Sequence, residues 1–268
     1  MTHESPLGKT ATYGGQYDPG LLFAIPRAES RGALGLGNDL PFNGCDIWNA
    51  WELTWLGPNG VPQIVSAMIR IPAYSPNLIE SKSLKLYLGS FAMTTVAGMD
   101  EVKEIITTDL RACTGTDIQL HLRTSVSDTA IDDFPGIGID TVDAQCDSYD
   151  VDASLLEAGE EIVSETLHSH LLRSLCPVTD QPDMGSVLIS YNGPRIDRVG
   201  LLKYIVSFRE HNDFHEACVE RMFIDILERC EPTQLSVYAR YQRRGGIDIN
   251  PFRSNFEHDP PNVRLWRQ

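Results

Sequence analysis

The sequence predicts an α+β protein in which helices cover one face of a sheet, built from two similar halves. Its 268 residues are 42% hydrophobic and 22% charged, an ordinary globular composition with enough apolar material for one large domain or two modest ones. Residues 64–71 and 185–191 alternate apolar and polar side chains and are rich in β-branched residues, which is typical of strands. The third observation is an internal repeat.

The repeat relates Leu84–Phe91 (LKLYLGSF) to Leu201–Phe208 (LLKYIVSF), an offset of 117 residues. Carried forward without a gap, the same offset pairs Cys113 with Cys230 and the strand-like residues 118–123 with 235–240. A gapless register through two helices and a strand favours duplication over chance. Both cysteines fall near helix ends, where we expect them to pack in the core.

Each half is therefore expected to run strand, helix, helix, strand. Apolar residues at helical spacing define the longer helices. The predicted first helices begin near Lys82 and Arg198, and the predicted second helices cover Glu101–Thr114 and His215–Cys230. Together these elements form a sheet with helices on one face, an α+β layer.

An acidic stretch joins the two halves. The net charge is −15, and twelve Asp and Glu residues lie between Asp128 and Glu165, a stretch without Lys or Arg. We interpret it as a solvated connecting segment rather than an acidic docking tail. The predicted division is residues 1–127, a connecting segment at 128–165, and residues 166–268. Such a surface repels phosphate backbones, which disfavours direct nucleic-acid binding, while the nearly neutral remainder leaves room for a local cationic pocket.

The cysteines and the chain's first residues indicate a cytoplasmic protein. Six cysteines are scattered without a CxxC pair, a pattern of reduced thiols rather than of disulfides or a zinc site, so no metal is expected. The first fifteen residues show no basic region followed by an apolar run, and no apolar stretch is long enough to cross a bilayer.

The stretch SLCPVTDQPDMG places Cys176 where the chain is polar and stiff. Pro177 and Pro182 push the residues before them toward extended geometry. Asp183 follows seven residues later, just before a predicted strand, so the loop could fold back and bring carboxyl and thiol together. One interpretation is a nucleophile with a proton carrier. The other is a buried thiol, with Asp183 capping a turn.

Two predicted helix starts also carry candidate residues. His215 and Glu216 can line one pocket, or they are a surface histidine beside an acid favoured by the helix dipole. In the run Glu80-Ser81-Lys82-Ser83, Ser81 or Ser83 is a candidate N-cap. Alternatively, free backbone amides and Lys82 hold a phosphate.

Of two glycine-containing stretches, one is a candidate ligand-binding segment and the other is not. Arg243 and Arg244 precede two glycines that let backbone approach a ligand closely, although without a pocket these arginines are solvated charges. The GALGLG stretch at 32–37 looks like a dinucleotide fingerprint, but no strand precedes it and no helix pattern follows, so we predict a loop.

Taken together, these stretches resemble the NADPH-dependent 7-cyano-7-deazaguanine reductases of queuosine biosynthesis, in their long, internally duplicated form. The resemblance covers nearly the whole chain. The Glu80-Ser81-Lys82-Ser83 run followed by LKLY, and the spacing of Cys176 and Asp183, are highly specific. The motifs are LPFNGCDIWNAWELTWL, LIESKSLKLYLGSF, CPVTDQPDMGS, VSFREHNDFHEACVERMF and YQRRGGIDINPFRSN. Leu175 stands where the family has asparagine and Met184 where it has tryptophan, which puts the pocket packing in doubt more than the chemistry.

The resemblance implies a fold, a reaction and a set of roles. The fold is the tunnelling fold, with two units per chain, an antiparallel sheet, and assembly as a homodimer. Cys176 would attack the nitrile to form a covalent thioimide, and two NADPH would reduce it to the amine. Asp183 would carry protons, with His215 assisting. Substrate binding would fall to Ile79, Glu80, Ser81, His215 and Glu216. Cofactor binding would fall to Ser81, Lys82, Arg244 and Gly245.

Other functions use some of the same residues. An amidase or nitrilase would keep the Cys176 nucleophile but deliver water, and it would have no use for Ser81, Lys82 and Arg244 as NADPH ligands. A purine-binding module that has lost catalysis is disfavoured by the intact Cys176–Asp183 pair. A cyclohydrolase of this fold would want zinc, for which the sequence shows no convincing Cys/His ligand set.

Overall fold

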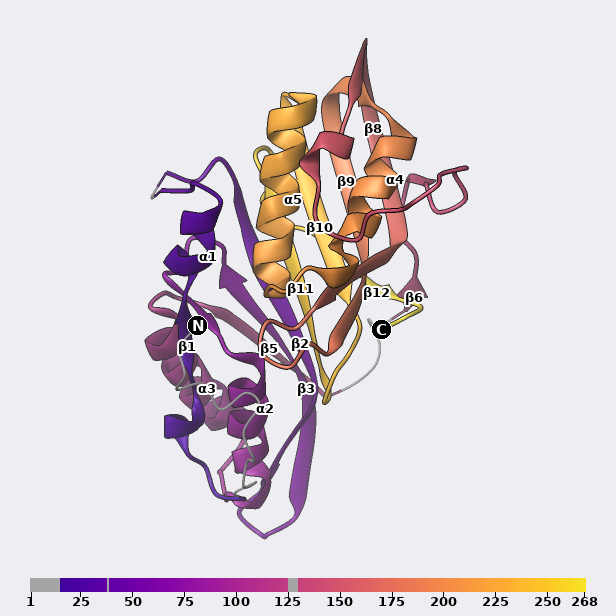
Figure 1. Ribbon diagram of the computed structural model, residues 1–268. Helices are drawn as coiled ribbons and strands as arrows, with labels where there is room; N and C mark the ends of the chain where they lie inside the picture. Colours follow the sequence, from indigo (N-terminus) through magenta and orange to yellow (C-terminus); the bar gives the residue numbers. More distant parts are fainter. Residues whose placement is uncertain (1–14, 38, 125–129) are drawn as a thin grey trace. The chain divides into compact units, whose positions relative to one another are not determined.

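The computed structural model describes residues 15–37, 39–124 and 130–268 (Figure 1). These residues form two compact units, each assembled from separate stretches of chain. Unit 1 takes its described residues from 1–30, 47–129 and 243–248. Unit 2 takes its described residues from 31–46, 130–242 and 249–268. The predicted boundary between residues 127 and 128 lies outside the described residues.

Unit 1 combines a sheet with two helices. Strand β3 (Pro62–Pro72) lies between β2 (Asn43–Leu56) and β5 (Gln119–Arg123), and β3 and β5 pair antiparallel from Ser66↔Arg123 to Arg70↔Gln119. A separate two-stranded sheet pairs β1 (Ala24–Pro26) with β4 (Asn77–Ile79). The remaining elements are η1 (Pro19–Leu21), α2 (Ser81–Ser90), η2 (Phe91–Met93) and α3 (Met99–Thr114).

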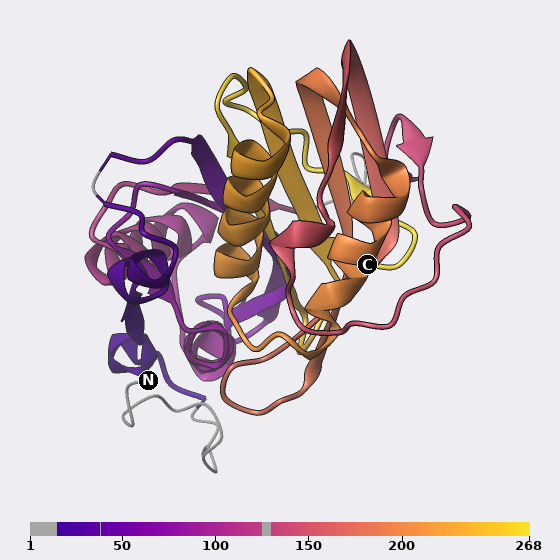
Figure 2. The same cartoon turned by 45° about the horizontal axis from the view of Figure 1, so that its top comes forward.

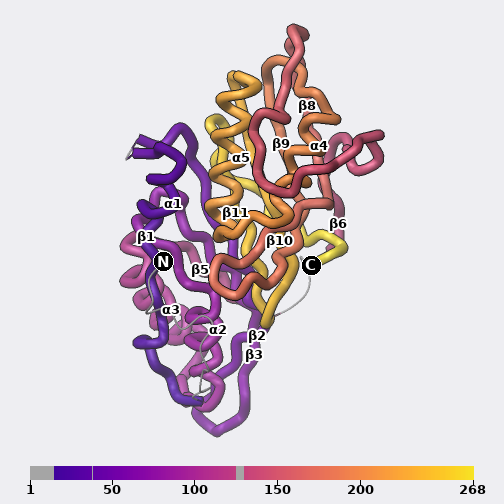
Figure 3. The backbone as a smooth tube through the Cα atoms, viewed as in Figure 1, coloured from indigo at the N-terminus to yellow at the C-terminus, as the bar shows by residue number. Residues whose placement is uncertain are grey.

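Unit 2 is a sheet in the order β11 (Ile247–Ser254), β10 (Gln234–Tyr241), β9 (Pro182–Ile196), β8 (Ala158–Leu175) and β7 (Ile137–Gly138). Its pairs are antiparallel except for β7 with β8. The trace in Figure 3 shows β8 and β9 side by side as a long hairpin.

Helices cover one face of the unit 2 sheet. Helix α4 (Arg198–Ser207) contacts β8, while α5 (His215–Cys230) contacts β9 and β10, as the orange ribbons of Figures 1 and 2 show. The shorter elements of the chain are α1 (Arg27–Ala33), η3 (Ala153–Leu155), η4 (Phe208–Glu210) and the parallel pair β6 (Ile131–Asp132) and β12 (Arg264–Leu265).

The predicted elements are confirmed, and local contacts recur at the predicted offset. Helices α2 and α4 have ten residues each, and α3 and α5 have sixteen. The rings of Tyr87 and Phe91 meet edge to face at 5.5 Å, and those of Tyr204 and Phe208 do so at 5.3 Å. In each case a serine three residues after the tyrosine donates to the tyrosine's backbone oxygen. Equivalent sequence thus produces equivalent local packing.

Four expectations need correction or detail. Gly32 lies in α1, so the predicted loop at 32–37 is wrong at its start, although α1 is only seven residues long. Asp183 lies within β9 rather than in a loop before it. Cys230 is buried as predicted, but Cys113 is only half-buried. Elements β6, β7, η3 and the start of β8 fall inside the acidic stretch 128–165.

Among the described residues, no helix combines the length and apolarity that crossing a bilayer requires.

A buried ion network ties several elements of unit 2 together. The Arg253 guanidinium, on β11, is fully buried and donates to Glu220 of α5 at 2.8 and 3.0 Å. It also donates at 2.8 Å to Asp46, which lies in the first part of β2 that belongs to unit 2. Arg31 of α1 donates to the same Glu220 carboxylate at 2.7 and 2.9 Å. Burial lowers the pKa of Arg253, but the charges and hydrogen bonds of Asp46 and Glu220 outweigh it and raise this pKa, so the guanidinium stays charged.

Candidate functional site

Cys176 occupies the turn of the β8–β9 hairpin. It directly follows β8, its backbone N–H donates to Gln181 O at 3.0 Å, and its own oxygen accepts from Asp180 N at 3.1 Å. Asp180 has a φ of 54°, a left-handed conformation that aspartate tolerates better than most residues. These bonds fix the backbone around the cysteine, in agreement with the stiff segment that we predicted from the two prolines.

The hairpin turn is held against the segment that leads into α5. Leu175 N donates to His211 O at 2.8 Å, and Asp213 N donates to Leu175 O at 3.2 Å, a short parallel bridge. The Asn212 side-chain amide donates to the Asp180 carboxylate at 2.5 Å. The residue before the cysteine and the start of α5 are therefore positioned by the same backbone hydrogen bonds.

Asp183 lies on the other arm of the hairpin. It pairs with Ser174, which comes two residues before Cys176. Because side chains two apart on a strand share a face and paired residues face the same way, this register directs Asp183 toward the side of the sheet on which Ser174 lies. Asp183 and Cys176 are both nearly buried, with 4% and 9% of their surfaces exposed. The hairpin register brings the two candidates to the same end of the same hairpin.

His215 contacts Asp183 and an aromatic ring. Its Nε2 lies 3.2 Å from the Asp183 Oδ2, and its ring stacks on Tyr241 with 3.8 Å between centroids and 11° between planes. The side chain of His215 is only 12% exposed, so the alternative of a surface histidine is wrong. The stacking fixes the imidazole plane, and the contact with Asp183 allows a proton to pass between the two groups.

Glu216 and Cys218 follow in the first turns of α5. Glu216 is 4% exposed and lies in the first turn of α5, so it is a buried acid at a helix start, where the dipole favours it as expected. Cys218 is fully buried. Its pKa is raised first by burial and then by the charge of Asp213, which keeps this thiol protonated. Cys218 is therefore a packing residue, in contrast to Cys176 at the hairpin turn.

In unit 1, the residues of the ESKS run form the start of α2. Ile79 is buried and ends β4, and Glu80 is the N-cap of the helix. Its Oε1 and Oε2 accept from the backbone N–H groups of Lys82 and Ser83 at 2.8 and 2.7 Å. The alternatives that placed Ser81 or Ser83 at the cap are wrong. The Glu80 carboxylate accepts from the backbone amides two and three residues ahead of it, which are the bonds that an N-cap side chain makes.

The electrostatics at this helix start combine burial with positive charge. Burial raises the pKa of Glu80, whereas the two amides and then Lys85 and Lys82 lower it. Each carboxylate oxygen keeps a second lone pair, so Glu80 can still accept from an N–H donor of a ligand. Lys85 is a basic residue of this site that the sequence analysis missed. Its spacing of three residues from Lys82, which puts both on one helix face, was the available signal.

Arg244 and Gly245 lie in a tight hairpin turn. Arg244 and Ile247 exchange backbone hydrogen bonds at 2.9 and 3.3 Å, and the central residues Gly245 and Gly246 have φ values of 60° and 80°. A two-residue turn of this kind needs positive φ at both positions, which glycine allows without strain. A Cβ on Gly245 would lie 3.1 Å from Cδ of Lys85. The glycine therefore lets the turn approach the lysine side chain of α2.

The turn is further braced by an aromatic residue of β2. The Arg243 guanidinium lies 4.3 Å over the Trp51 ring, and Trp51 N donates to Gly246 O at 2.9 Å. Asp248 accepts from the Trp51 indole N–H at 2.6 Å and from the Asn49 amide at 2.7 Å. Unit 1 thus gathers Lys85, Arg243 and Arg244 around a rigid glycine turn, a donor set suited to an anionic phosphate.

The predicted site residues divide between the two units. Unit 2 holds Cys176, Asp183, His215 and Glu216. Unit 1 holds Ile79, Glu80, Ser81, Lys82, Arg244 and Gly245. Within unit 2 the structure joins His215 to Asp183, and within unit 1 it places Gly245 beside the helix that carries the lysines. The stacking of Tyr241 on His215 could not be predicted from the sequence, because a tyrosine in an apolar strand cannot be told from other core residues.

Comparisons with known proteins match both parts of the chain. Residues 13–122 match the family described as "Nitrile reductase, 7-cyano-7-deazaguanine-reductase N-term", and residues 182–260 match that described as "QueF-like protein". Among the relatives, the proteins named NADPH-dependent 7-cyano-7-deazaguanine reductase from Paraburkholderia xenovorans (strain LB400) and Paraburkholderia phytofirmans (strain DSM 17436 / LMG 22146 / PsJN) are each 53% identical to this chain. Both alignments span 100% of both sequences. That of Burkholderia multivorans (strain ATCC 17616 / 249) is 52% identical over 98% of each.

Proposed function

This chain belongs to the NADPH-dependent 7-cyano-7-deazaguanine reductase family, and we propose that it reduces the nitrile of 7-cyano-7-deazaguanine to the primary amine, 7-aminomethyl-7-deazaguanine, in queuosine biosynthesis. The protein is accordingly an NADPH-dependent nitrile reductase. The observation that carries the proposed chemistry is the β8–β9 hairpin, which holds a cysteine in its turn and, near the start of β9, a carboxyl group that contacts a histidine.

Cys176 is the proposed nucleophile. Its thiol adds across the carbon–nitrogen triple bond: a sulfur–carbon bond forms, the thiol proton passes to the nitrogen, and the product is a covalent thioimide. After the first reduction the carbon–sulfur bond breaks, which returns the thiolate and leaves an imine for the second reduction. A fixed turn favours this addition because the sulfur is positioned before the substrate arrives.

Asp183 and His215 are the proposed proton carriers. Asp183 accepts the thiol proton and returns it to the nitrile nitrogen. This transfer suits a buried carboxyl that has His215 Nε2 at 3.2 Å. The stacking of His215 on Tyr241 keeps the imidazole aligned with that carboxyl. The nitrogen gains two protons in total on becoming an amine, so a group that can be reprotonated is needed.

Substrate recognition is assigned to groups that accept hydrogen bonds. The guanine-like edge of the substrate presents N–H donors, and carboxylates are acceptors. Glu80 and Glu216, both buried, are proposed to accept from that edge, with Ile79, Ser81 and His215 contributing further contacts. Glu80 already holds two backbone amides at the start of α2, which fixes its orientation before any ligand binds.

NADPH binding is assigned to Ser81, Lys82, Arg244 and Gly245, and we add Lys85 because its side chain lies beside Gly245. The fit rests on the open glycine turn beside Lys85 and on the cations around it, since the cofactor is anionic. When bound, NADPH supplies the hydrides, one for each of the two reductions. A hydrolase acting through the same cysteine would have no use for this group of cations.

The remaining proposals concern organisation. We propose that the chain is a tandem pair of tunnelling-fold halves, that it assembles as a homodimer in the cytoplasm, and that it does not bind nucleic acid directly. The contacts that recur 117 residues apart support the duplication. The acidic net charge of −15 supports the absence of a nucleic-acid partner.

The test is a stoichiometric assay. Purified protein is mixed with 7-cyano-7-deazaguanine and NADPH, NADPH oxidation is followed by absorbance, and the amine is quantified by mass spectrometry. Two NADPH are expected to be oxidised for each amine formed. Formation of the amide or acid without NADPH oxidation would show a hydrolase instead, and NADPH-independent binding without turnover would show a base-binding module.

A further inference from the structure

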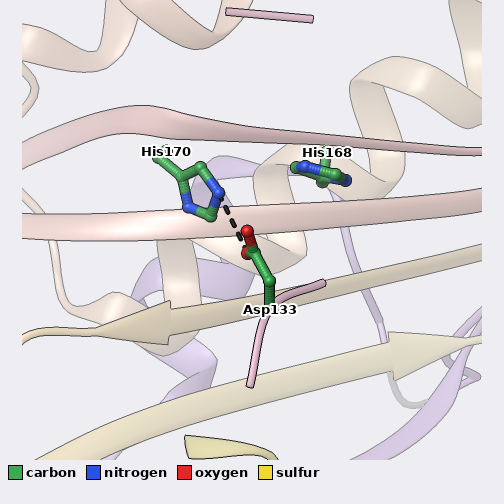
Figure 4. A group of neighbouring side chains, drawn as sticks. All are labelled: Asp133, His168 and His170. Carbon is green, nitrogen blue, oxygen red and sulfur yellow. Dashed lines mark ion pairs between the residues drawn. The ribbon is translucent and has the colours of Figure 1, made fainter. Parts of the chain in front are cut away.

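A cluster of metal-ligand residues lies in unit 2, apart from the residues assigned to catalysis. Asp133, His168 and His170 each present one ligand atom, and these atoms lie within 4.8 Å of one another. Figure 4 shows the His170 ring facing the Asp133 carboxylate, with the His168 ring beside them. The His170 Nε2 and Asp133 Oδ1 are 3.1 Å apart. This is close to the spacing of about 3.3 Å expected for two ligands of a tetrahedral zinc ion.

The two histidines are presented together by strand β8. They are two residues apart, next to the irregularity in the β8–β9 pairing between Ser169 and Leu172, and their ring centroids are 5.3 Å apart. The residues between and before them, Ser169 and Leu167, are fully buried on the other side. The strand thus directs two imidazoles away from the core and toward one point.

Both imidazoles are oriented through their second nitrogen. His168 Nδ1 lies 3.1 Å from the backbone oxygen of Pro135, and His170 Nδ1 lies 2.8 Å from Ser186 Oγ. A carbonyl oxygen can only accept, so this contact makes Nδ1 the donor, and the tautomer that it selects has its lone pair on Nε2. Metal-bound histidines commonly engage a carbonyl or another acceptor in this way, which fixes the tautomer and the ring orientation.

The segment that carries Asp133 is packed closely on β8. Gly136 has a φ of 89°, and a Cβ there would lie 2.2 Å from the Thr166 backbone oxygen. Two residues on, Gly138 pairs with His168 in the parallel β7–β8 ladder, and a Cβ on Gly138 would lie 3.1 Å from the His168 Nε2. Two glycines thus allow the segment to lie against the strand and leave space at the ligand nitrogen.

Two carboxylates supply negative charge at this cluster, and the Arg267 guanidinium supplies a positive charge at the backbone oxygen of His170. Asp133 contributes a carboxylate. A second one, on Asp140, accepts from Ser169 Oγ at 2.6 Å and from His170 N at 3.0 Å. Arg267 donates to the backbone oxygen of His170 and so helps to fix the strand at that residue. The Asp133 side chain is 55% exposed, so it can rotate and bring its carboxylate closer to the histidine nitrogens than the present spacing of up to 4.8 Å between ligand atoms. The same exposure leaves a position for water as a fourth ligand.

We propose that Asp133, His168 and His170 bind a divalent transition-metal ion, with Zn²⁺ as the best match, and that the ion ties the segment 131–139 to strand β8. Imidazole and carboxylate ligands suit Zn²⁺, whereas Mg²⁺ and Ca²⁺ prefer sites made of oxygen alone. The site is structural, because none of its three residues belongs to the groups assigned to nitrile reduction. Sequence spacing hides it, since Asp133 lies 35 residues before His168.

The test counts ions on the full chain. Protein is stripped with a chelator, incubated with Zn²⁺ or with Co²⁺ as a spectroscopic probe, separated from free metal, and analysed for bound metal. One ion per chain is expected, with visible Co²⁺ absorption from a nitrogen and oxygen ligand set. His168→Gln and Asp133→Asn should each weaken binding by at least about ten-fold. His121→Gln, which removes an exposed histidine of β5 outside the cluster, should leave binding unchanged.

A second variant guards against misfolding of the ligand variants. Gly138→Ala keeps all three ligands and places a methyl group against the His168 Nε2, so it should also weaken binding. In parallel, Zn²⁺ should raise the unfolding temperature of the wild type more than that of His168→Gln. The proposal is overturned if the wild type retains no ion, if the ligand variants bind as tightly as the wild type, or if Co²⁺ absorption is that of thiolate ligands.

Discussion

His211 gives the most quantitative prediction, because its burial makes stability depend on pH. The residue precedes α5, and its backbone oxygen accepts the N–H of Leu175, the residue before Cys176. Its ring packs edge to face on Phe208 at 5.4 Å. Burial, and then the positive charge of Arg221, lower the pKa of His211 from 6.5 to about 4. Protonation of this histidine is therefore opposed in the folded state.

The sign and size of the pH effect on the free energy of unfolding follow from the difference in His211 pKa between the folded and unfolded chains. Between about pH 6.5 and pH 4 the unfolded chain binds a proton at this position and the folded chain does not, so stability is lost as the pH falls through this window. A shift of about 2.5 units corresponds to roughly 3 kcal/mol when the window is fully crossed. Between about pH 7 and pH 5 the loss from this one group is about 2 kcal/mol.

The assay compares wild type with His211→Gln, which fills similar space and does not titrate. The free energy of unfolding is measured by urea titration at about pH 7 and about pH 5 for both proteins. Other groups titrate equally in both, so the difference between the two pH-dependent losses isolates His211. The wild type should lose about 2 kcal/mol more than the variant. His121→Gln, at an exposed position, should behave as the wild type does.

Equal losses for wild type and His211→Gln would refute this reasoning, since they would mean that His211 titrates alike in folded and unfolded chains. A greater loss in the variant would reverse the sign and show that the folded state favours the protonated form. In that case the nearby Asp213, whose Oδ2 lies 3.9 Å from His211 Nε2, would dominate over burial.

Three further predictions test other parts of the account. Asp183→Asn should lower the turnover rate by about 10²- to 10⁴-fold while NADPH binding is unchanged, and a rate within a few-fold of wild type would remove Asp183 from proton transfer. Lys82→Met should raise the KM for NADPH by about ten-fold or more but leave that for the nitrile unchanged. Lys103→Met, on the exposed side of α3, serves as the control. Arg253→Met should cost about 3–5 kcal/mol of unfolding free energy by urea titration, because it removes a charge partner from buried Glu220 and Asp46; a cost below about 1 kcal/mol would contradict this.

The helices were predictable because their patterns are local. Val102, Ile106 and Leu110 recur at helical spacing and are fully buried in α3, and Gly115 ends that helix in the left-handed conformation. In α5, Val219, Met222 and Ile226 are likewise fully buried, and the left-handed residue that ends the helix is Glu231. The 117-residue repeat gave each element a second sequence from which to predict it. The predicted strands of the two halves were confirmed as β3 and β5, and as β9 and β10.

The features that the sequence did not reveal depend on pairings between distant residues. The start of α2 was recognised, but the cap is Glu80 rather than a serine, because chain geometry at Ile79 decides which side chain reaches the amides. Tyr241 lies under His215 only because β10 runs beside the hairpin. Each compact unit is assembled from three separate stretches of chain, a division that no local composition marks.

The most direct test of the central claim is the intact mass of the protein after incubation with 7-cyano-7-deazaguanine in the absence of NADPH. The wild type should gain the mass of one substrate per chain, and Cys176→Ala should gain none while it still binds the base non-covalently. An unmodified wild type under conditions where the base is bound, or an adduct that persists in Cys176→Ala, would contradict this claim.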